Sequence, residues 1–165
     1  MLITGASGLL GNNLAYFFKE GYDILGLYNA HPVTIEGVRL QKLNLLSQAS
    51  VEKIIDDFSP DIIIHCAAIA DVELCETEKP LADEINVLAT KILVDAIDRI
   101  KKSLKLIHIS TDLVYDGSKG DYREEDPLKP LNYYGLTKQK AEWEALRIKN
   151  ALVVRTSFFG WNIID

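Results

Sequence analysis

A tyrosine and a lysine four positions apart carry the clearest chemical signal in this sequence. Tyr134 and Lys138 lie in a segment whose pattern predicts the first turns of a helix. One helical turn places such residues on the same face, roughly 5–6 Å apart at their Cβ atoms. A nearby ammonium favours the phenolate, so we expect Tyr134 to exchange a proton more readily than its reference pKa of about 10 suggests. The spacing therefore indicates an acid–base pair.

A glycine-rich turn near the N-terminus predicts what this pair acts with. Gly5, Gly8 and Gly11 follow a short apolar run and open a helical pattern. Glycines let the backbone turn tightly and approach a pyrophosphate, whose charge then faces the helix N-terminus. The spacing is GxxGxxG rather than GxGxxG, but its place at a strand–helix junction favours dinucleotide binding. Together, the turn and the pair suggest hydride transfer coupled to proton transfer.

The end of the second predicted strand bears on the choice of dinucleotide. An acidic residue there would bind the adenosine ribose and indicate NAD. The strand ends at Tyr28 and Asn29, with no acid and no adjacent arginine. The sequence therefore favours NADP, or use of both cofactors.

Small and hydroxyl-bearing residues follow two further strands. Cys66–Ala68 leave room for a ligand in the crevice of an α/β sheet, although tight packing against a helix accounts equally well for either alanine taken alone. Ser110 and Thr111 come off the fifth strand, where a hydroxyl can hydrogen-bond a substrate carbonyl; an ordinary turn or cap is the alternative. His65 and His108 lie within strand patterns, and we interpret them as hydrogen-bonded structural histidines.

The elements that must position these residues alternate between strands and helices. Strands are predicted at Met1–Thr4, Asp23–Tyr28, Val38–Leu43, Asp61–Cys66, Lys105–Ser110 and Leu152–Arg155. Helices are predicted from Leu10 to Gly21, after Ser47 to Phe58, from Leu81 to Ile100 and from Tyr133 to about Ile148. Several strands are continuous apolar runs, as in parallel sheets buried on both faces. The fold class is thus α/β, a Rossmann-type doubly wound parallel sheet in the order 3-2-1-4-5-6.

Composition narrows the possible partners. The 165 residues carry a net charge of -6, which argues against a nucleic-acid partner. No run approaches the ~20 apolar residues of a membrane span, and no signal peptide is visible. The two cysteines show no disulfide or metal-binding pattern, so we expect free thiols, no metal, and a cytoplasmic protein.

In combination, these motifs resemble the extended short-chain dehydrogenase/reductase family over essentially the whole chain. The matching features are the glycine turn, Cys66–Ala68, Asn86, Ile109–Asp112 and the Tyr134/Lys138 pair. Within that family, residues 71–76, 110–117, 122–126 and 130–135 resemble the dTDP-4-dehydrorhamnose reductases. The resemblance implies an NAD(P)-binding Rossmann domain over residues 1–165, expected to be the N-terminal part of a longer reductase whose C-terminal substrate lobe is absent from this chain.

The likeness implies roles for individual residues. Thr111, Tyr134 and Lys138 would be catalytic: Tyr134 would donate a proton to a C4 carbonyl, Lys138 would hold the ribose hydroxyls of the nicotinamide cofactor, and Thr111 would orient the carbonyl. NADPH or NADH would be the cofactor, with NADP favoured, and a 4-keto-6-deoxy sugar nucleotide the substrate. The cofactor-binding residues would be Gly5, Ser7, Gly8, Leu9, Leu10, Gly11, Tyr28, Asn29, Asn44, Leu45, Cys66, Ala67, Ala68, Ser110, Tyr134 and Lys138.

Two other readings stay open. Residues 44–46, 64–68 and 122–126 fit the regulatory β-subunit of methionine adenosyltransferase at least as well, which would make the chain a dinucleotide-binding module that docks on a catalytic partner. Another sugar-nucleotide epimerase or oxidoreductase is the second alternative, although Asp112-Leu113 stands where related dehydratases carry Asp-Glu and so speaks against dehydration. A homodimer is possible in each case.

Overall fold

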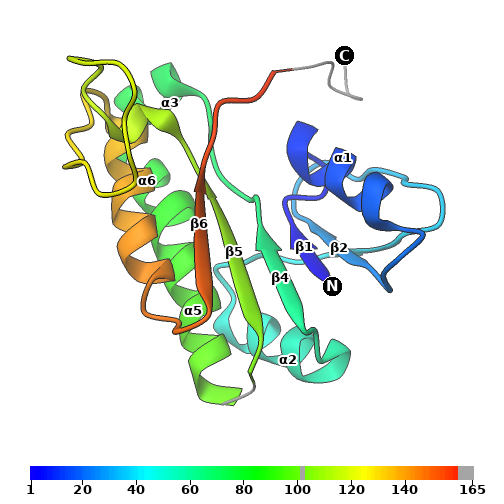
Figure 1. Ribbon diagram of the computed structural model, residues 1–165. Coiled ribbons are helices and arrows are strands. Elements are labelled where there is room, and N and C mark those ends of the chain that lie inside the picture. Colours follow the sequence, from blue (N-terminus) through cyan, green and yellow to red (C-terminus); the bar gives the residue numbers. More distant parts are fainter. Residues whose placement is uncertain (101–102, 160–165) are drawn as a thin grey trace.

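A six-stranded, wholly parallel sheet forms the centre of the protein (Figure 1). The computed structural model describes residues 1–100 and 103–159. The strand order is β3-β2-β1-β4-β5-β6, so the predicted doubly wound order 3-2-1-4-5-6 is confirmed. The strands are β1 (Leu2–Thr4), β2 (Leu25–Tyr28), β3 (Arg39–Lys42), β4 (Ile62–His65), β5 (Lys105–Ser110) and β6 (Ala151–Arg155).

Helices cover the two faces of the sheet unequally. On one face, α2 (Gln48–Phe58), α5 (Ala89–Ile100) and α6 (Tyr133–Ala145) contribute to a core that includes Leu2, Ile63 and Leu106. On the other face, α1 (Leu9–Phe18) packs near the neighbouring residues Ile3 and Ile64 (Figure 1). Because successive strand residues point to opposite faces, the apolar runs of β1 and β4 supply both cores.

The third predicted helix differs from the expectation. Instead of one α-helix from Leu81 to Ile100, the chain forms α4 (Lys79–Ala82), the π-helix η1 (Asp83–Leu88) and α5. π-helical turns insert an extra residue into a helix and often lie at functional sites. Two short elements escaped prediction altogether: α3 (Val72–Thr77), whose N-cap Asp71 accepts a hydrogen bond from Leu74 N, and the 3-10 helix η2 (Asp112–Val114). The apolar periodicity of a sequence cannot detect such single turns.

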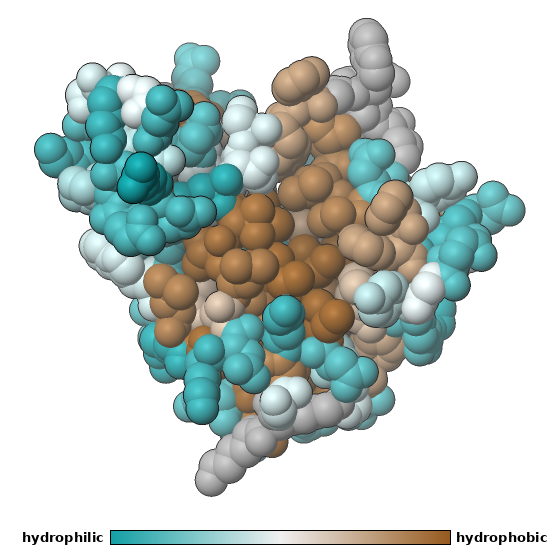
Figure 2. Space-filling view, viewed as in Figure 1, coloured by the Kyte–Doolittle hydropathy of each residue, from teal (hydrophilic) through white to brown (hydrophobic). Residues whose placement is uncertain are grey.

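The α1 side of β4, β5 and β6 carries a broad apolar surface. Figure 2 shows apolar side chains gathered on this side of the molecule. Leu152 on β6 and Phe158 just beyond it are 48% and 46% exposed, so they are uncovered within the described part of the chain. The strands of the sheet, rather than a helix, form this surface. Separately, no helix in residues 1–100 and 103–159 has the length and apolar character needed to cross a bilayer.

Candidate functional site

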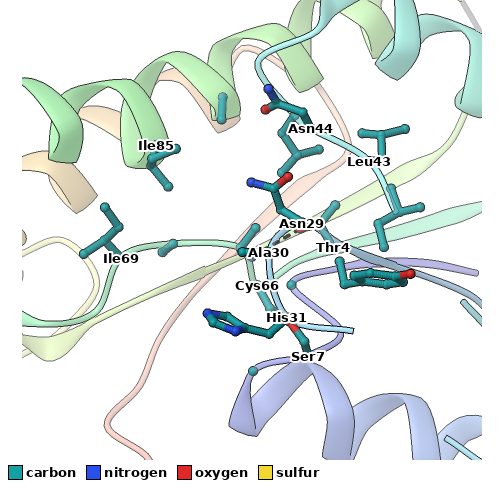
Figure 3. Close-up of a pocket in the computed structure, with 18 of the residues that line it drawn as sticks. Thr4, Ser7, Asn29, Ala30, His31, Leu43, Asn44, Cys66, Ile69 and Ile85 are labelled. Atoms are coloured by element: carbon teal, nitrogen blue, oxygen red, sulfur yellow. Dashed lines mark hydrogen bonds between the residues drawn. The ribbon is translucent and has the colours of Figure 1, made fainter. Parts of the chain in front are cut away.

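A cavity of about 410 Å³ opens beside the carboxyl ends of β1, β2 and β4 (Figure 3). The strand order reverses between β1 and β4, the place where α/β sheets bind ligands. The cavity brings together ten residues that the sequence assigned to cofactor binding: Gly5, Ser7, Gly8, Tyr28, Asn29, Asn44, Leu45, Cys66, Ala67 and Ala68. Ile69, Ile85 and Ala89 also line it and were not predicted; Ile85 and Ala89 lie four residues apart, a spacing that places them on one helix face.

The glycine turn has a shape that only glycine permits. Gly5 has φ +68°, and a Cβ added there would lie 2.8 Å from both Cα and N of Ala67. At Gly11, an added Cβ would overlap the carbonyl oxygen of Gly5. The turn therefore passes directly against the backbone that follows β4, with no side chain in between.

The N-terminus of α1 is open to an anion. Gly8 is its N-cap, no side chain caps it, and no acidic residue stands in its first turn. Helix geometry leaves the N–H groups of Leu9, Leu10 and Gly11 without acceptors inside the helix. These three residues lie outside the cavity lining, but their N–H groups and the helix dipole suit a pyrophosphate.

The cavity wall near β2 holds few charges. Among the described residues, the lining contains no Asp, Glu, Lys or Arg. His31 is exposed and lines the cavity together with Asn29 (Figure 3). Nothing in this wall would repel an adenosine 2′-phosphate.

Thr111 and Tyr134 lie together at the start of α6, outside the cavity lining. Asn132 caps this helix, its Oδ1 accepting a hydrogen bond from Gly135 N at 2.7 Å. Thr111 in turn caps η2, its Oγ1 accepting from Leu113 N at 3.2 Å. Thr111 Oγ1 donates to Asp112 Oδ1 at 3.1 Å, and the Thr111 side chain is close enough to Tyr134 to act on its pKa.

The expected effect of Lys138 on Tyr134 is wrong for this structure. Burial raises the pKa of Tyr134, and the neighbouring Thr111 side chain only partly offsets this effect. The spacing of the two residues reveals their common helix face but not the loss of solvent around the phenol. Tyr134 consequently keeps its proton at neutral pH.

Lys138 is itself a perturbed group. It is 3% exposed, and burial lowers the pKa of its ammonium to about 8. Burial also raises the pKa of the neighbouring Cys66 thiol to about 12, so this thiol stays protonated. An ammonium with a pKa near neutrality can change its charge when a ligand binds beside it.

His65 is a structural histidine, as the sequence indicated. Its Nδ1 lies 2.7 Å from Thr4 Oγ1 and its Nε2 lies 3.0 Å from Thr90 Oγ1. Because Thr90 Oγ1 donates to the carbonyl of Asn86, it accepts from His65, which places the ring proton on Nε2. Burial lowers the pKa of His65 to about 3, so the ring is neutral.

His108 departs from the same expectation. It is fully buried, and neither ring nitrogen has a hydrogen-bond partner within the described part of the chain. Its ring lies 5.3 Å from that of His65, and burial holds its pKa well below the ordinary value. The prediction of a hydrogen-bonded histidine is wrong here, because the alternation of the strand shows burial but not the partners of the side chain.

Asn86 joins the segment beside the cavity to α6. From the π-helix η1, its Oδ1 accepts from Ile69 N at 2.8 Å, and its Nδ2 donates to Ile69 O at 3.1 Å and to Thr137 Oγ1 at 2.9 Å. The π-helical turn thus carries the side chain that ties the segment after β4 to α6. Asn86 matched a family motif, but nothing in the sequence revealed these partners.

Ser110 takes part in a buried network that the sequence did not reveal. Its hydroxyl donates to Glu142 Oε1 at 2.5 Å, and Arg155 donates to the same carboxylate. The sequence does carry one indication of the place of Glu142: Tyr134, Lys138 and Glu142 follow one another at four-residue steps, which places all three on one side of α6.

The chain is similar to known proteins along most of its length. The model of the family described as the RmlD substrate binding domain matches residues 1–160. The chain is 40% identical over 149 residues to the methionine adenosyltransferase 2 subunit beta of Xenopus laevis, covering 88% of this chain and 42% of that protein.

Solved structures of reductases are also similar to this chain. A hypothetical dTDP-4-dehydrorhamnose reductase from Sulfolobus tokodaii is 42% identical with a TM-score of 0.83, covering 93% of this chain and 54% of that one. The dTDP-4-dehydrorhamnose reductase of Bacillus anthracis, solved in complex with NADP, is 29% identical with a TM-score of 0.76, covering 98% and 55%. The chain therefore spans about half the length of the relatives it matches.

Proposed function

The chain belongs to the family of the RmlD substrate binding domain, and from this premise we propose that it binds a nicotinamide dinucleotide and forms the cofactor-binding part of a sugar-nucleotide reductase. The observation that carries this proposal is the meeting of three features at one switch point: the glycine turn against Ala67, the 410 Å³ cavity, and the buried Lys138 ammonium beside Cys66 of the cavity lining. The glycine turn and the uncapped N-terminus of α1 support a pyrophosphate site at this junction.

Each residue of the group has a role in this proposal. Reduced nicotinamide, when bound, supplies the hydride. Tyr134, whose pKa is raised by burial, carries its proton and donates it to the developing alkoxide, and Thr111 orients the carbonyl by a hydrogen bond. Lys138 places a positive charge beside the nucleotide and stabilises the negative charge that develops. The substrate we propose is a 4-keto-6-deoxy sugar nucleotide of the kind named for the reductase relatives.

We propose NADPH as the preferred cofactor. The support is the cavity wall after β2, where Asn29 and His31 stand and no carboxylate repels a 2′-phosphate. Replacing Asn29 with Asp should bring a negative charge to that position. The ratio of the dissociation constants for NADPH and NADH, measured by cofactor fluorescence, should then shift at least about tenfold towards NADH, as expected for roughly 1.4 kcal/mol of repulsion. A ratio unchanged by this substitution would argue against the preference.

A regulatory role is the second candidate, favoured by the 40% identity to a methionine adenosyltransferase subunit. In that case the same crevice binds a dinucleotide without turnover, and a catalytic partner occupies another surface. Retention of Tyr134 and Lys138 does not separate the two functions. Binding to a methionine adenosyltransferase in the absence of reductase activity would favour the regulator.

Turnover by the whole protein tests the reductase proposal. We expect oxidation of NADPH, followed at 340 nm, when dTDP-4-dehydro-6-deoxy-L-mannose is added. Tyr134→Phe should remove at least about 99% of turnover, consistent with the 10²–10⁴-fold contribution of a positioned acid, and leave the dissociation constant of NADPH within twofold. Tyr16→Phe, at an exposed position on α1, is the matched control and should behave as the parent. Reduction by the Tyr134→Phe protein at the parental rate would refute the assignment.

A further inference from the structure

A single buried carboxylate connects four parts of the fold beside the catalytic group. Glu142 on α6 is 1% exposed. Its oxygens accept from Ser110 Oγ at 2.5 Å, from Arg155 Nε at 3.1 and 3.2 Å, and from Arg155 Nη2 at 2.8 Å. Ser110 ends β5 and Arg155 ends β6, so Glu142 holds the helix to the carboxyl ends of both strands.

Arg155 extends these connections to the loop that follows η2. Its Nη1 donates to Tyr115 Oη at 2.6 Å and to the carbonyl of Glu124 at 3.1 Å. Tyr115 stacks on Tyr122 with ring centroids 4.3 Å apart. The loop is therefore ordered by the same ion pair that anchors α6.

The position of Glu142 relates it to all three catalytic candidates. Tyr134 and Lys138 precede Glu142 by two turns and one turn on the same helix. Thr111 directly follows Ser110, whose hydroxyl donates to Glu142. Moving this carboxylate would shift the helix that bears the tyrosine and lysine relative to the strand that bears the threonine.

We propose that Glu142 is a positioning residue, whose buried carboxylate fixes α6 against β5 and β6 and supplies the negative charge that faces the Lys138 ammonium. The inference rests on the proposed reductase function and adds to it a residue that touches neither cofactor nor substrate.

The other titratable groups around Lys138 do not supply this charge. They are Cys66 and His65 from the end of β4 and His108 from β5. The two imidazoles are neutral, and the Cys66 thiol, with a pKa of about 12, keeps its proton where Lys138 titrates. Glu142 is the carboxylate among the groups that raise the pKa of Lys138 against the effect of burial.

The pH profile of the reductase tests the proposal. With the whole protein, kcat/KM for NADPH should fall above about pH 8 as Lys138 loses its proton. Glu142→Gln keeps the shape of the side chain and removes its charge. The alkaline limb, the fall of kcat/KM at high pH, should then occur at a pH at least about one unit lower, as expected for the loss of a charge one helical turn away. Glu144→Gln, on the same helix and paired with Arg147 outside the network, is the matched control and should leave the limb unchanged.

An alkaline limb that stays within 0.3 pH units of the parent value (about 0.4 kcal/mol) in a folded Glu142→Gln protein overturns the proposal, whatever its rate. If that variant does not fold, Arg155→Lys decides. It retains the carboxylate but loses the forked contacts to Glu142 and Tyr115, so kcat should fall at least about fivefold with the limb unmoved; an unchanged kcat overturns the proposal. If the unsubstituted protein does not oxidise NADPH in this assay, the result counts against the reductase function itself.

Discussion

Replacing Gly5 with alanine should damage both stability and cofactor binding, for reasons that the structure separates. With φ at +68°, an alanine there pays roughly 1–2 kcal/mol for the left-handed conformation. Its Cβ would also lie 2.8 Å from the Ala67 backbone, and relieving such a contact adds about 1–3 kcal/mol. We expect the free energy of unfolding to fall by about 2–5 kcal/mol. Because Ala67 lines the cavity, we expect the dissociation constant of NADPH to rise at least about tenfold, or roughly 1.4 kcal/mol.

Gly37 provides the matched control. It has φ +78°, but the nearest atom to an added Cβ is Lys19 Cδ at 3.6 Å, an ordinary contact. Gly37→Ala should therefore show the conformational penalty alone, about 1–2 kcal/mol, with unchanged NADPH affinity. Urea unfolding and fluorescence titration measure the two quantities. Equal losses of stability in the two variants, or an NADPH affinity that Gly5→Ala leaves intact, would refute the reasoning about the turn.

Two further substitutions probe the buried polar groups. Burial lowers the pKa of Lys138 from 10.5 to about 8, so below pH 8 its ammonium costs up to about 3 kcal/mol. Lys138→Met should stabilise the free protein at pH 7 by up to that amount. The parent protein should gain stability between about pH 8 and 10.5, and this gain should be absent in the variant. Urea unfolding across this pH range measures both effects, and a destabilised variant would contradict the account. Asn86→Ala removes three hydrogen bonds, two to Ile69 and one to Thr137, and should cost about 3 kcal/mol in the same assay. A loss below about 1 kcal/mol would show that these bonds contribute little.

The sheet was predictable because its signals are local. The isoleucine run of Ile62–His65 is typical of a strand buried on both faces, and the alternation of strands with helices indicates a doubly wound parallel sheet. The glycine turn was predictable for a related reason, since the backbone at Gly5 excludes any side chain.

What escaped prediction depends on partners distant in sequence. The π-helical turn around Asn86 is held by Ile69 and Thr137, and the spacing of apolar residues in that segment is also compatible with an ordinary α-helix. Tyr134 was predicted to be acidified by its helix neighbour, yet its pKa follows from burial. The burial of Glu142 depends on Ser110 and Arg155, which reach its carboxylate from separate strands.

A crystal structure with NADPH bound would test the central claim most directly. The account predicts the pyrophosphate at the N-terminus of α1 beside Gly8, and C4 of the nicotinamide within about 4–5 Å of Tyr134 Oη, close enough for a carbonyl to lie between them. NADPH bound on another surface, or a nicotinamide ring directed away from Tyr134 and Lys138, would contradict it.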